Sequence, residues 1–157
     1  MGVEIERKFL VDKEQWTQLA KPQGKHYRQG YILSEVTKTI RVRITDEHGY
    51  ITIKGATEGI SRKEYEYIIP INEGAELLDN FAVSELEKTR YCINFAGKVW
   101  EVDEFLGDNK GLLVAEIELE NEAETFKLPA WATTEVTGDK KYYNSNLAVK
   151  PFKSWNS

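Results

Sequence analysis

Hydrophobic and polar residues alternate with a period of two over most of this chain. This alternation is typical of β-strands with one buried and one polar face, because successive side chains point to opposite sides of a strand. Turn-rich connections separate several of the segments, which predicts an antiparallel barrel or sandwich rather than an α/β fold. The eight segments are Val3–Val11, His26–Leu33, Thr37–Thr45, Tyr50–Gly55, Arg62–Pro70, Glu87–Phe95, Lys98–Phe105 and Leu112–Glu120.

Helical patterns are few and short. Asp12 is a helix-capping residue type, and a proline follows the end of three of the helical stretches. We expect these helices to cover the apolar outer face of the sheet or to plug one end of a barrel. The predicted helices are residues 12–21, Asn72–Phe81, Glu120–Lys127 and Asn144–Val149.

The composition indicates one globular domain spanning residues 1–157, with 41% hydrophobic and 30% charged residues. A net charge of −5 argues against binding a nucleic acid polymer through bulk electrostatics. The single cysteine, Cys92, cannot form an internal disulfide, which favours a reducing compartment. The chain has no apolar run of membrane-spanning length and no signal-peptide pattern. We therefore expect a soluble cytoplasmic protein without membrane partners, either a monomer or a homodimer.

Charges of the same sign recur two residues apart within the predicted strands. Such side chains share one face, about 6–7 Å apart along the strand, and most residues between them are apolar. A solvated polar face explains one such strand, but repeated like-charged pairs repel each other and are unfavourable for folding. The acidic pairs are Glu4/Glu6, Glu64/Glu66, Glu101/Asp103 and Glu116/Glu118; the basic pairs are Arg41/Arg43 and Lys88/Arg90, with Lys8 and Lys54 standing alone.

These charges suit a triphosphate bound together with a metal ion inside a barrel. Carboxylates are the ligands that Mg²⁺ or Mn²⁺ prefers, while arginine binds phosphate bidentately and lysine acts as a point charge. Phosphoryl transfer chiefly requires positioning and charge neutralisation. The alternative is an internal ion-pair network without a ligand, but so many buried pairs would carry a large desolvation cost. No P-loop, HExxH, GxGxxG or CxxC motif is present, so the strands themselves would have to build the site.

The ordered set of motifs along the chain resembles the CYTH superfamily, the triphosphate tunnel metalloenzymes. The opening strand carries Glu4-x-Glu6-x-Lys8, and the resemblance extends over essentially the whole chain. It implies a mainly β (α+β) fold, a closed eight-stranded antiparallel β-barrel or tunnel with short covering helices. The further matching motifs are Arg28-Gln-Gly-Tyr31, Arg41-x-Arg43, Thr52-Ile-Lys54, Ser61-Arg-Lys-Glu-Tyr-Glu66, Glu87-Lys-Thr-Arg-Tyr91, Glu101-Val-Asp-Glu-Phe105, Glu116-Ile-Glu118 and Val136-Thr-Gly-Asp139.

The resemblance also implies roles for individual residues. The metal ligands would be Glu4, Glu6, Glu116 and Glu118, with Glu64 or Glu66 joining them or orienting water. The phosphates would be held by Lys8, Arg41, Arg43, Lys54, Lys88 and Arg90, and Asp103 would orient these basic side chains. Lys141 is a further candidate for phosphate binding; it stands where the family usually has arginine, so it keeps the charge there but lacks the bidentate fork.

Two residues are candidates for the general base. Lys88 could accept a proton from water if its basic neighbours lower its pKa, and Tyr31 could do so if it faces inward. The leading hypothesis is metal-dependent hydrolysis of a triphosphate, most specifically inorganic tripolyphosphate, as in small bacterial members of the family. The alternatives are a class IV-type adenylate cyclase, a thiamine-triphosphatase, or a non-catalytic module that binds polyphosphate or nucleotide.

Overall fold

The structure, a computed structural model, describes residues 2–155 and contains the eight expected strands. The observed strands begin and end within about three residues of the alternating segments, as expected for boundaries set by pairing rather than by pattern alone. A short ninth strand, β9, was not expected from the sequence. The strands are β1 (Val3–Val11), β2 (Lys25–Ser34), β3 (Lys38–Ile44), β4 (Gly49–Glu58), β5 (Ser61–Ile69), β6 (Ser84–Phe95), β7 (Lys98–Phe105), β8 (Leu113–Glu118) and β9 (Ala132–Glu135).

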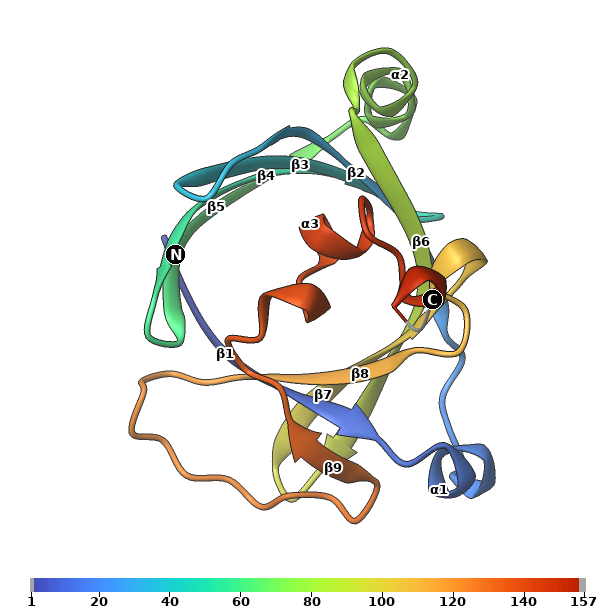
Figure 1. Cartoon of the computed structure of the whole chain (residues 1–157), viewed down its shortest axis with the longest axis vertical. Helices are drawn as coiled ribbons and strands as arrows, with labels where there is room; N and C mark the ends of the chain where they lie inside the picture. The colour runs from blue at the N-terminus through green and yellow to red at the C-terminus, as the bar shows by residue number, and fades with distance from the viewer. Residues whose placement is uncertain (1, 156–157) are drawn as a thin grey trace.

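The first eight strands form a closed antiparallel barrel, which Figure 1 shows end-on. Their order is β5-β4-β3-β2-β6-β7-β8-β1, and β1 pairs again with β5 to close the ring. Val3 lies opposite Lys63 and Glu4 opposite Arg62 at this closure. The second half of β1 pairs with β9 instead, where Phe9 lies opposite Glu135. The prediction of a closed eight-stranded antiparallel barrel is confirmed.

Three short α-helices and three 3₁₀ turns accompany the barrel. Helix α1 (Lys13–Gln18) begins where expected, because the side chain of Asp12 accepts a hydrogen bond from the Gln15 backbone N–H at 3.0 Å. It ends three residues before the predicted end at Lys21. The remaining elements are α2 (Ile71–Phe81), α3 (Asn144–Leu147), η1 (Gly107–Asn109), η2 (Lys140–Tyr142) and η3 (Phe152–Ser154).

The helix predicted over Glu120–Lys127 is wrong, since this segment forms turns and extended chain. The side chain of Asn121 accepts a hydrogen bond from the Ala123 backbone N–H at 2.9 Å, which gives the chain a local alternative to a helix. Phe126 then packs edge-on against Trp100 and Phe9. Side-chain capping and aromatic packing thus outweigh the helical propensity of the segment.

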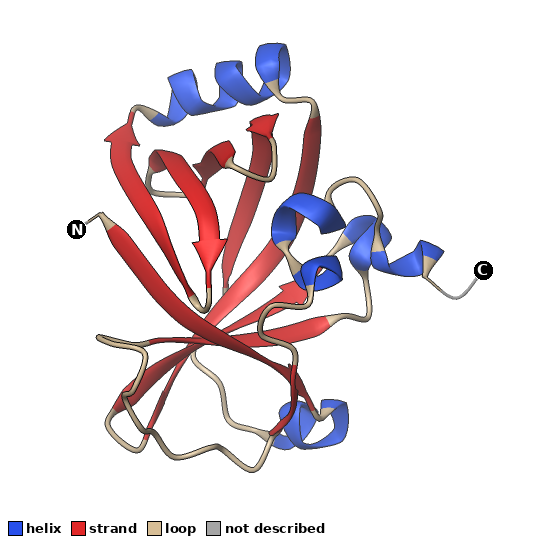
Figure 2. Ribbon diagram, turned by 60° about the vertical axis from the view of Figure 1, so that its left-hand side comes forward, coloured by secondary structure: helices blue, strands red, loops and turns tan. Residues whose placement is uncertain are grey.

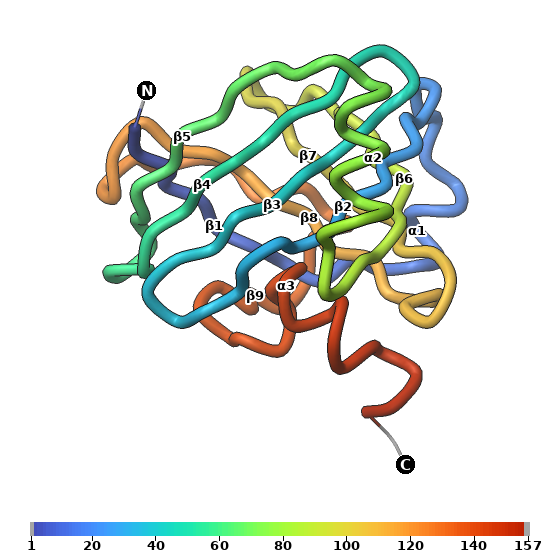
Figure 3. Tube along the Cα trace, turned by 90° about the horizontal axis from the view of Figure 1, so that it is seen from above, coloured from blue at the N-terminus to red at the C-terminus, as the bar shows by residue number. Residues whose placement is uncertain are grey.

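Helix α2 covers the outside of the barrel (Figures 2 and 3). It packs closely against the sheet at two glycines, one in the helix and one in β2. A Cβ atom on Gly74 would lie 2.6 Å from Cγ2 of Ile44, and one on Gly30 would lie 2.8 Å from Cδ2 of Leu78. The missing side chains let the helix approach β2 and β3. No helix of residues 2–155 is long and apolar enough to cross a membrane.

Two apolar clusters hold the barrel together. One lies outside the ring, where Trp131 packs edge-on against Trp16 and Trp100, and these side chains cluster with apolar residues of β1 and β8. The other lies at one end of the barrel, where the C-terminal segment of residues 139–155, called here the C-terminal plug, packs onto the inner wall; Figure 1 shows α3 inside the ring. The buried residues of this second cluster are Leu86, Phe105, Leu112, Val114, Val136, Tyr142 and Leu147. The short helices therefore have both predicted positions, since α2 covers the outer face and α3 closes one end of the barrel.

Candidate active site

Beyond the apolar end, the interior of the barrel is a charged cavity of about 220 Å³. It is formed by the alternate residues of the strands that face inward, because the barrel turns one face of every strand toward its axis. Thirteen of the fifteen site residues predicted from the sequence line it: Glu4, Glu6, Lys8, Tyr31, Arg41, Arg43, Lys54, Glu64, Glu66, Lys88, Arg90, Glu116 and Glu118. The strand alternation thus brings these distant residues into one site.

The acidic side of the cavity is formed by β1 and β8. Glu6 lies opposite Glu118, and Lys8 opposite Glu116, in the register of these two strands. Burial together with the negative charges of Glu116 and Glu4 raises the pKa of Glu6 well above its ordinary value. Burial opposes the ionisation of Glu116, but Lys8 and Arg90 hold its pKa well below the usual range. The opposite shifts in the pKa of Glu6 and Glu116 show that the carboxylates on this side are crowded and compete for the neighbouring cations.

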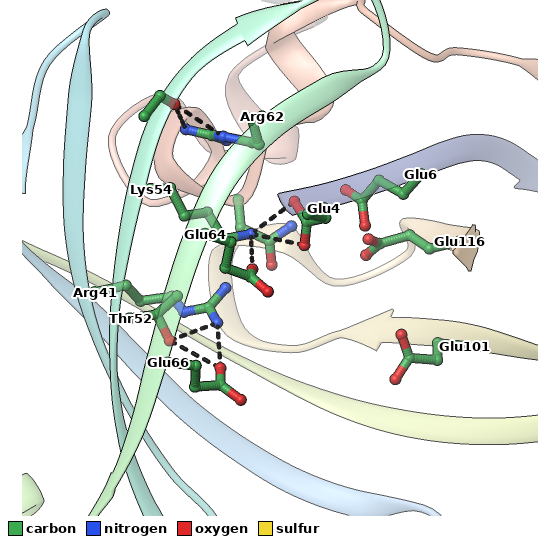
Figure 4. A network of polar contacts seen from close by, with 12 residues as sticks. Glu4, Glu6, Arg41, Thr52, Lys54, Arg62, Glu64, Glu66, Glu101 and Glu116 are labelled. Carbon is green, nitrogen blue, oxygen red and sulfur yellow. Dashed lines mark hydrogen bonds and ion pairs between the residues drawn. The ribbon is translucent and has the colours of Figure 1, made fainter. Parts of the chain in front are cut away.

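Lys54 links the acidic side to β5. Its ammonium lies 3.2 Å from Glu4 and 3.2 Å from Glu64, as Figure 4 shows. Glu66, farther along β5, accepts hydrogen bonds from the hydroxyl of Thr52 at 2.8 Å and from Arg41 at 3.4 Å. Among residues 2–155, no three carboxylate, histidine or cysteine side chains are gathered as a ready-made metal shell. Glu4 and Glu64 instead form ion pairs with Lys54.

The basic side of the cavity contains two arginines with incomplete partners. Arg43 donates through Nε to Gln29 at 2.9 Å, but no carboxylate within residues 2–155 forms an ion pair with it. Burial lowers the pKa of Arg43 to about 10, together with the positive charges of Arg41 and Arg90. The buried Nε of Arg41 has no hydrogen-bond partner. This part of the cavity therefore has unpaired donors and excess positive charge.

Asp103 lies behind the basic side, fully buried, and holds two of its members. Its carboxylate binds Arg90 through two hydrogen bonds of 2.7 and 2.9 Å and accepts a third from Lys88 at 2.7 Å. Burial opposes its ionisation, but Arg90 and Lys88 keep the pKa of Asp103 below its ordinary value. This placement agrees with the orienting role that the sequence suggested.

Lys88 and Tyr31, the two candidates for the general base, are both buried at the cavity wall. Burial lowers the pKa of Lys88 to about 7, and the nearby Arg90 and Arg43 add to this against the opposing charge of Asp103. The hydroxyl of Tyr31 accepts a hydrogen bond from the amide of Gln29 at 3.2 Å. A substantial fraction of neutral lysine amine is therefore present at neutral pH.

Lys141 does not reach the cavity. Its ammonium lies over the rings of Trp155 and Tyr142, 4.9 and 5.3 Å from their centroids. This cation–π contact holds the side chain against the C-terminal plug. The phosphate-binding role predicted for Lys141 has no geometric support.

Some residues of the site are absent from the sequence-based set. Arg62 and Asn144 line the cavity, while Gln29 and Thr52 support its side chains from behind. Gln29 and Arg62 share the inward parity of Tyr31 and Glu64, so the alternation rule could have identified them. Asn144 belongs to the C-terminal plug, and no strand pattern indicates its position.

Comparisons with known proteins agree with this geometry. The model of the CYTH domain family matches residues 2–147. An inorganic triphosphatase from Acetivibrio thermocellus is 51% identical over 99% of both chains, and one from Nitrosomonas europaea is 36% identical over 93% of this chain and 97% of its own. A crystal structure of an inorganic triphosphatase covers 92% of this chain and 93% of its own at 32% identity, with a TM-score of 0.64. The chain therefore belongs to the CYTH domain family.

Proposed function

We propose that this protein hydrolyses a triphosphate, most specifically inorganic tripolyphosphate, inside the charged cavity of its barrel. The observation that carries the proposal is the positive charge of Arg43, which has no carboxylate partner among residues 2–155, together with the unpartnered Nε of Arg41 beside it. A guanidinium partly removed from water beside other cations and without a carboxylate is unfavourable unless an anion binds it. The names of the two similar bacterial proteins support inorganic triphosphate as that anion.

The phosphate chain would lie along the basic side. Arg41 and Arg43 offer planar forks for bidentate contacts, while Lys8 and Lys54 supply point charges. Arg90 also faces the cavity and is fixed by its paired hydrogen bonds to Asp103. These side chains neutralise the oxygens of the transferred phosphoryl group and hold the departing pyrophosphate.

The acidic side fits a divalent cation such as Mg²⁺ or Mn²⁺. The donor set consists of hard carboxylate oxygens, and burial together with the charges of Glu116 and Glu4 raises the pKa of Glu6, which a bound cation would counteract. Glu4, Glu6, Glu116 and Glu118 would hold the metal, with Glu64 and Glu66 beside them. When bound, the ion would neutralise phosphate oxygens and polarise the phosphorus for attack.

Lys88 is the proposed general base, and Tyr31 is the second candidate. In this step the oxygen of a water molecule forms a bond to the terminal phosphorus, and the bridging P–O bond breaks. The proton of the water passes to the neutral amine of Lys88, whose pKa of about 7 suits this role at neutral pH. The products are orthophosphate and pyrophosphate.

The competing activities would need a pocket for an organic group. The cavity lining is almost entirely polar, with Ile60, Tyr31 and Tyr143 its main apolar side chains. A nucleobase or a thiamine ring would have little apolar surface to occupy, which favours the inorganic substrate. A binding module without catalysis would have no use for a lysine amine tuned close to neutrality.

The test supplies tripolyphosphate, ATP and thiamine triphosphate separately, with Mg²⁺ or Mn²⁺, and measures orthophosphate and cyclic AMP. We expect orthophosphate from tripolyphosphate, and we expect Glu116→Gln to weaken the metal dependence and lower the rate about 100-fold. Glu104→Gln is the matched control, because Glu104 lies on neighbouring β7 outside the cavity lining. Cyclic AMP with pyrophosphate would establish a cyclase instead, and tight binding without turnover would leave a sensor.

A further inference from the structure

The C-terminal plug reaches the catalytic side of the cavity through one polar side chain. Asn144, the first residue of α3, directs its carboxamide oxygen at Lys88, and the distance between this oxygen and the lysine Nζ is 2.8 Å. The same amine donates a second hydrogen bond to the carboxylate of Asp103 on β7, at 2.7 Å. The amine is thus held between a strand of the barrel and the C-terminal plug.

The same oxygen of Asn144 belongs to a longer hydrogen-bond network. It accepts a second hydrogen bond from Nε2 of Gln29 at 3.2 Å, and this Nε2 also donates to the hydroxyl of Tyr31 at 3.2 Å. The Oε1 of Gln29 accepts from Arg43 at 2.9 Å. Gln29 is fully buried, so it has little freedom to move away from these partners. Asn144 therefore contacts one candidate base directly and the other through a single amide.

The apolar end of the barrel holds Asn144 in place. Tyr142 and Leu147, on either side of it in sequence, are buried against inner-wall side chains that include Leu86 and Phe105. A carboxamide between two such anchors has a fixed position and needs no rearrangement when substrate binds. Nδ2 of Asn144 donates to none of residues 2–155, so the contacts of its side chain all run through its oxygen.

This arrangement determines where the lone pair of a neutral Lys88 points. A neutral amine has two N–H bonds and one lone pair, and Asp103 and Asn144 are the two acceptors for those N–H bonds. The lone pair is left at the remaining tetrahedral position, on a side chain that lines the cavity. With Asp103 as its one acceptor, the amine could rotate about the Cε–Nζ bond, and its lone pair would have no single direction.

We propose that Asn144 is a positioning residue for hydrolysis, whose carboxamide oxygen orients the amine of Lys88 toward the attacking water. The proposal rests on the proposed function, in which Lys88 is the general base. It makes the C-terminal plug a part of the active site in addition to a closure of the barrel.

Kinetic measurements test this role with Asn144→Ala and Asn144→Asp. A misdirected base slows the chemical step without weakening phosphate binding, so Asn144→Ala should lower kcat about 10- to 100-fold with KM nearly unchanged. Asn144→Asp keeps an acceptor oxygen and should recover much of kcat at higher pH. Asn146→Ala is the matched control, since Asn146 lies on the same helix and its side chain binds only the backbone of Lys140.

A second measurement needs no substrate and no metal. The ¹³Cε resonance of Lys88, assigned by its loss in Lys88→Arg, reports the protonation of the amine during a pH titration. The charged groups that face this amine are Asp103 on β7, Arg90 on β6, Arg43 on β3 and Glu116 on β8, and the variants leave all four in place. Loss of an acceptor destabilises the ammonium, so Asn144→Ala should lower the pKa of Lys88, while the added carboxylate of Asn144→Asp should raise it.

These opposite shifts in the pKa of Lys88 distinguish a positioning role from structural damage, because structural damage would shift this pKa in the same direction in both variants. Unchanged Lys88 titration together with unchanged kcat in Asn144→Ala, alongside normal wild-type turnover, would overturn the role of Asn144 alone. Absence of wild-type turnover on any triphosphate would overturn the proposed function itself.

Discussion

At the scale of single residues, the basic side of the cavity is suited to binding an anion and lowers the stability of the protein without ligand. Arg43 is half-buried beside the buried Arg41 and Arg90 and has no carboxylate of its own within the described chain; desolvation and these two positive charges lower its pKa. The carboxylates nearby are engaged elsewhere, as Asp103 is with Arg90. The folded protein without ligand therefore contains a repulsion that a bound polyanion would offset.

Arg43→Met should separate the effect of this charge on protein stability from its effect on substrate binding. Removing the charge relieves repulsion, so the melting temperature of the metal-free, phosphate-free protein should rise by a few degrees, consistent with about 1 kcal/mol. The same change should raise KM for tripolyphosphate about 10- to 100-fold through loss of a charge-assisted contact. Calorimetry and steady-state kinetics measure the two effects, with Lys38→Met, on the exposed face of the same strand, as control. Lower stability together with unchanged KM would contradict this account of the basic side.

The pKa of Lys88 predicts a pH dependence of both rate and stability. The neutral amine acts as base, so kcat should fall as pH decreases below about 7. Between about 7 and the ordinary value of 10.5 the folded chain binds fewer protons at Lys88 than the unfolded chain does, so stability should rise with pH across this window. Lys88→Met should lose both dependences and about 10²- to 10⁴-fold in kcat.

Urea unfolding and pH–rate profiles of wild type, Lys88→Met and Tyr31→Phe test this prediction. If Lys88→Met kept the wild-type acid limb and only Tyr31→Phe abolished turnover, the base would be Tyr31. The sequence alone could not choose between them, because burial beside Arg90 and Arg43 is a property of the folded cavity.

At the scale of elements, the alternation of polar and apolar residues predicted the strands and the inward faces well. Period two is a direct consequence of strand geometry, so Glu4, Glu6 and Lys8 could be assigned to one face before any fold was known. The segment Glu120–Lys127 shows where such reasoning fails. Its helix-forming residues are governed by the cap from Asn121 and by the packing of Phe126, which depends on β1 and β7.

The contact between α2 and the barrel gives a prediction at this scale. Gly74→Ala places a methyl group 2.6 Å from Ile44, so the free energy of unfolding should fall by about 1–3 kcal/mol. Because α2 lies outside the cavity, kcat and KM of the folded protein should stay unchanged. Chemical denaturation and kinetics measure this, and Glu76→Ala, on the exposed side of the helix, should have little effect on stability. A stable Gly74→Ala protein would show that α2 sits farther from β3 than described.

At the scale of the whole molecule, the sequence left barrel and sandwich open. Alternation says which side chains share a face, but closure depends on the pairing of β1 with β5, whose residues lie about 60 positions apart. The resemblance to the CYTH family supplied this step. The position of the C-terminal plug inside the ring was likewise beyond the strand pattern, and with it the contact between Asn144 and Lys88.

The central claim is that the barrel interior directs water to the terminal phosphorus of tripolyphosphate. A single turnover in H₂¹⁸O with a divalent cation, followed by mass spectrometry of the products, tests it most directly. One orthophosphate carrying one ¹⁸O and one unlabelled pyrophosphate are expected for each substrate, with their rate of formation lowered about 100-fold in Glu116→Gln. Label in the pyrophosphate, or bound tripolyphosphate that is never cleaved with any divalent cation, would contradict it.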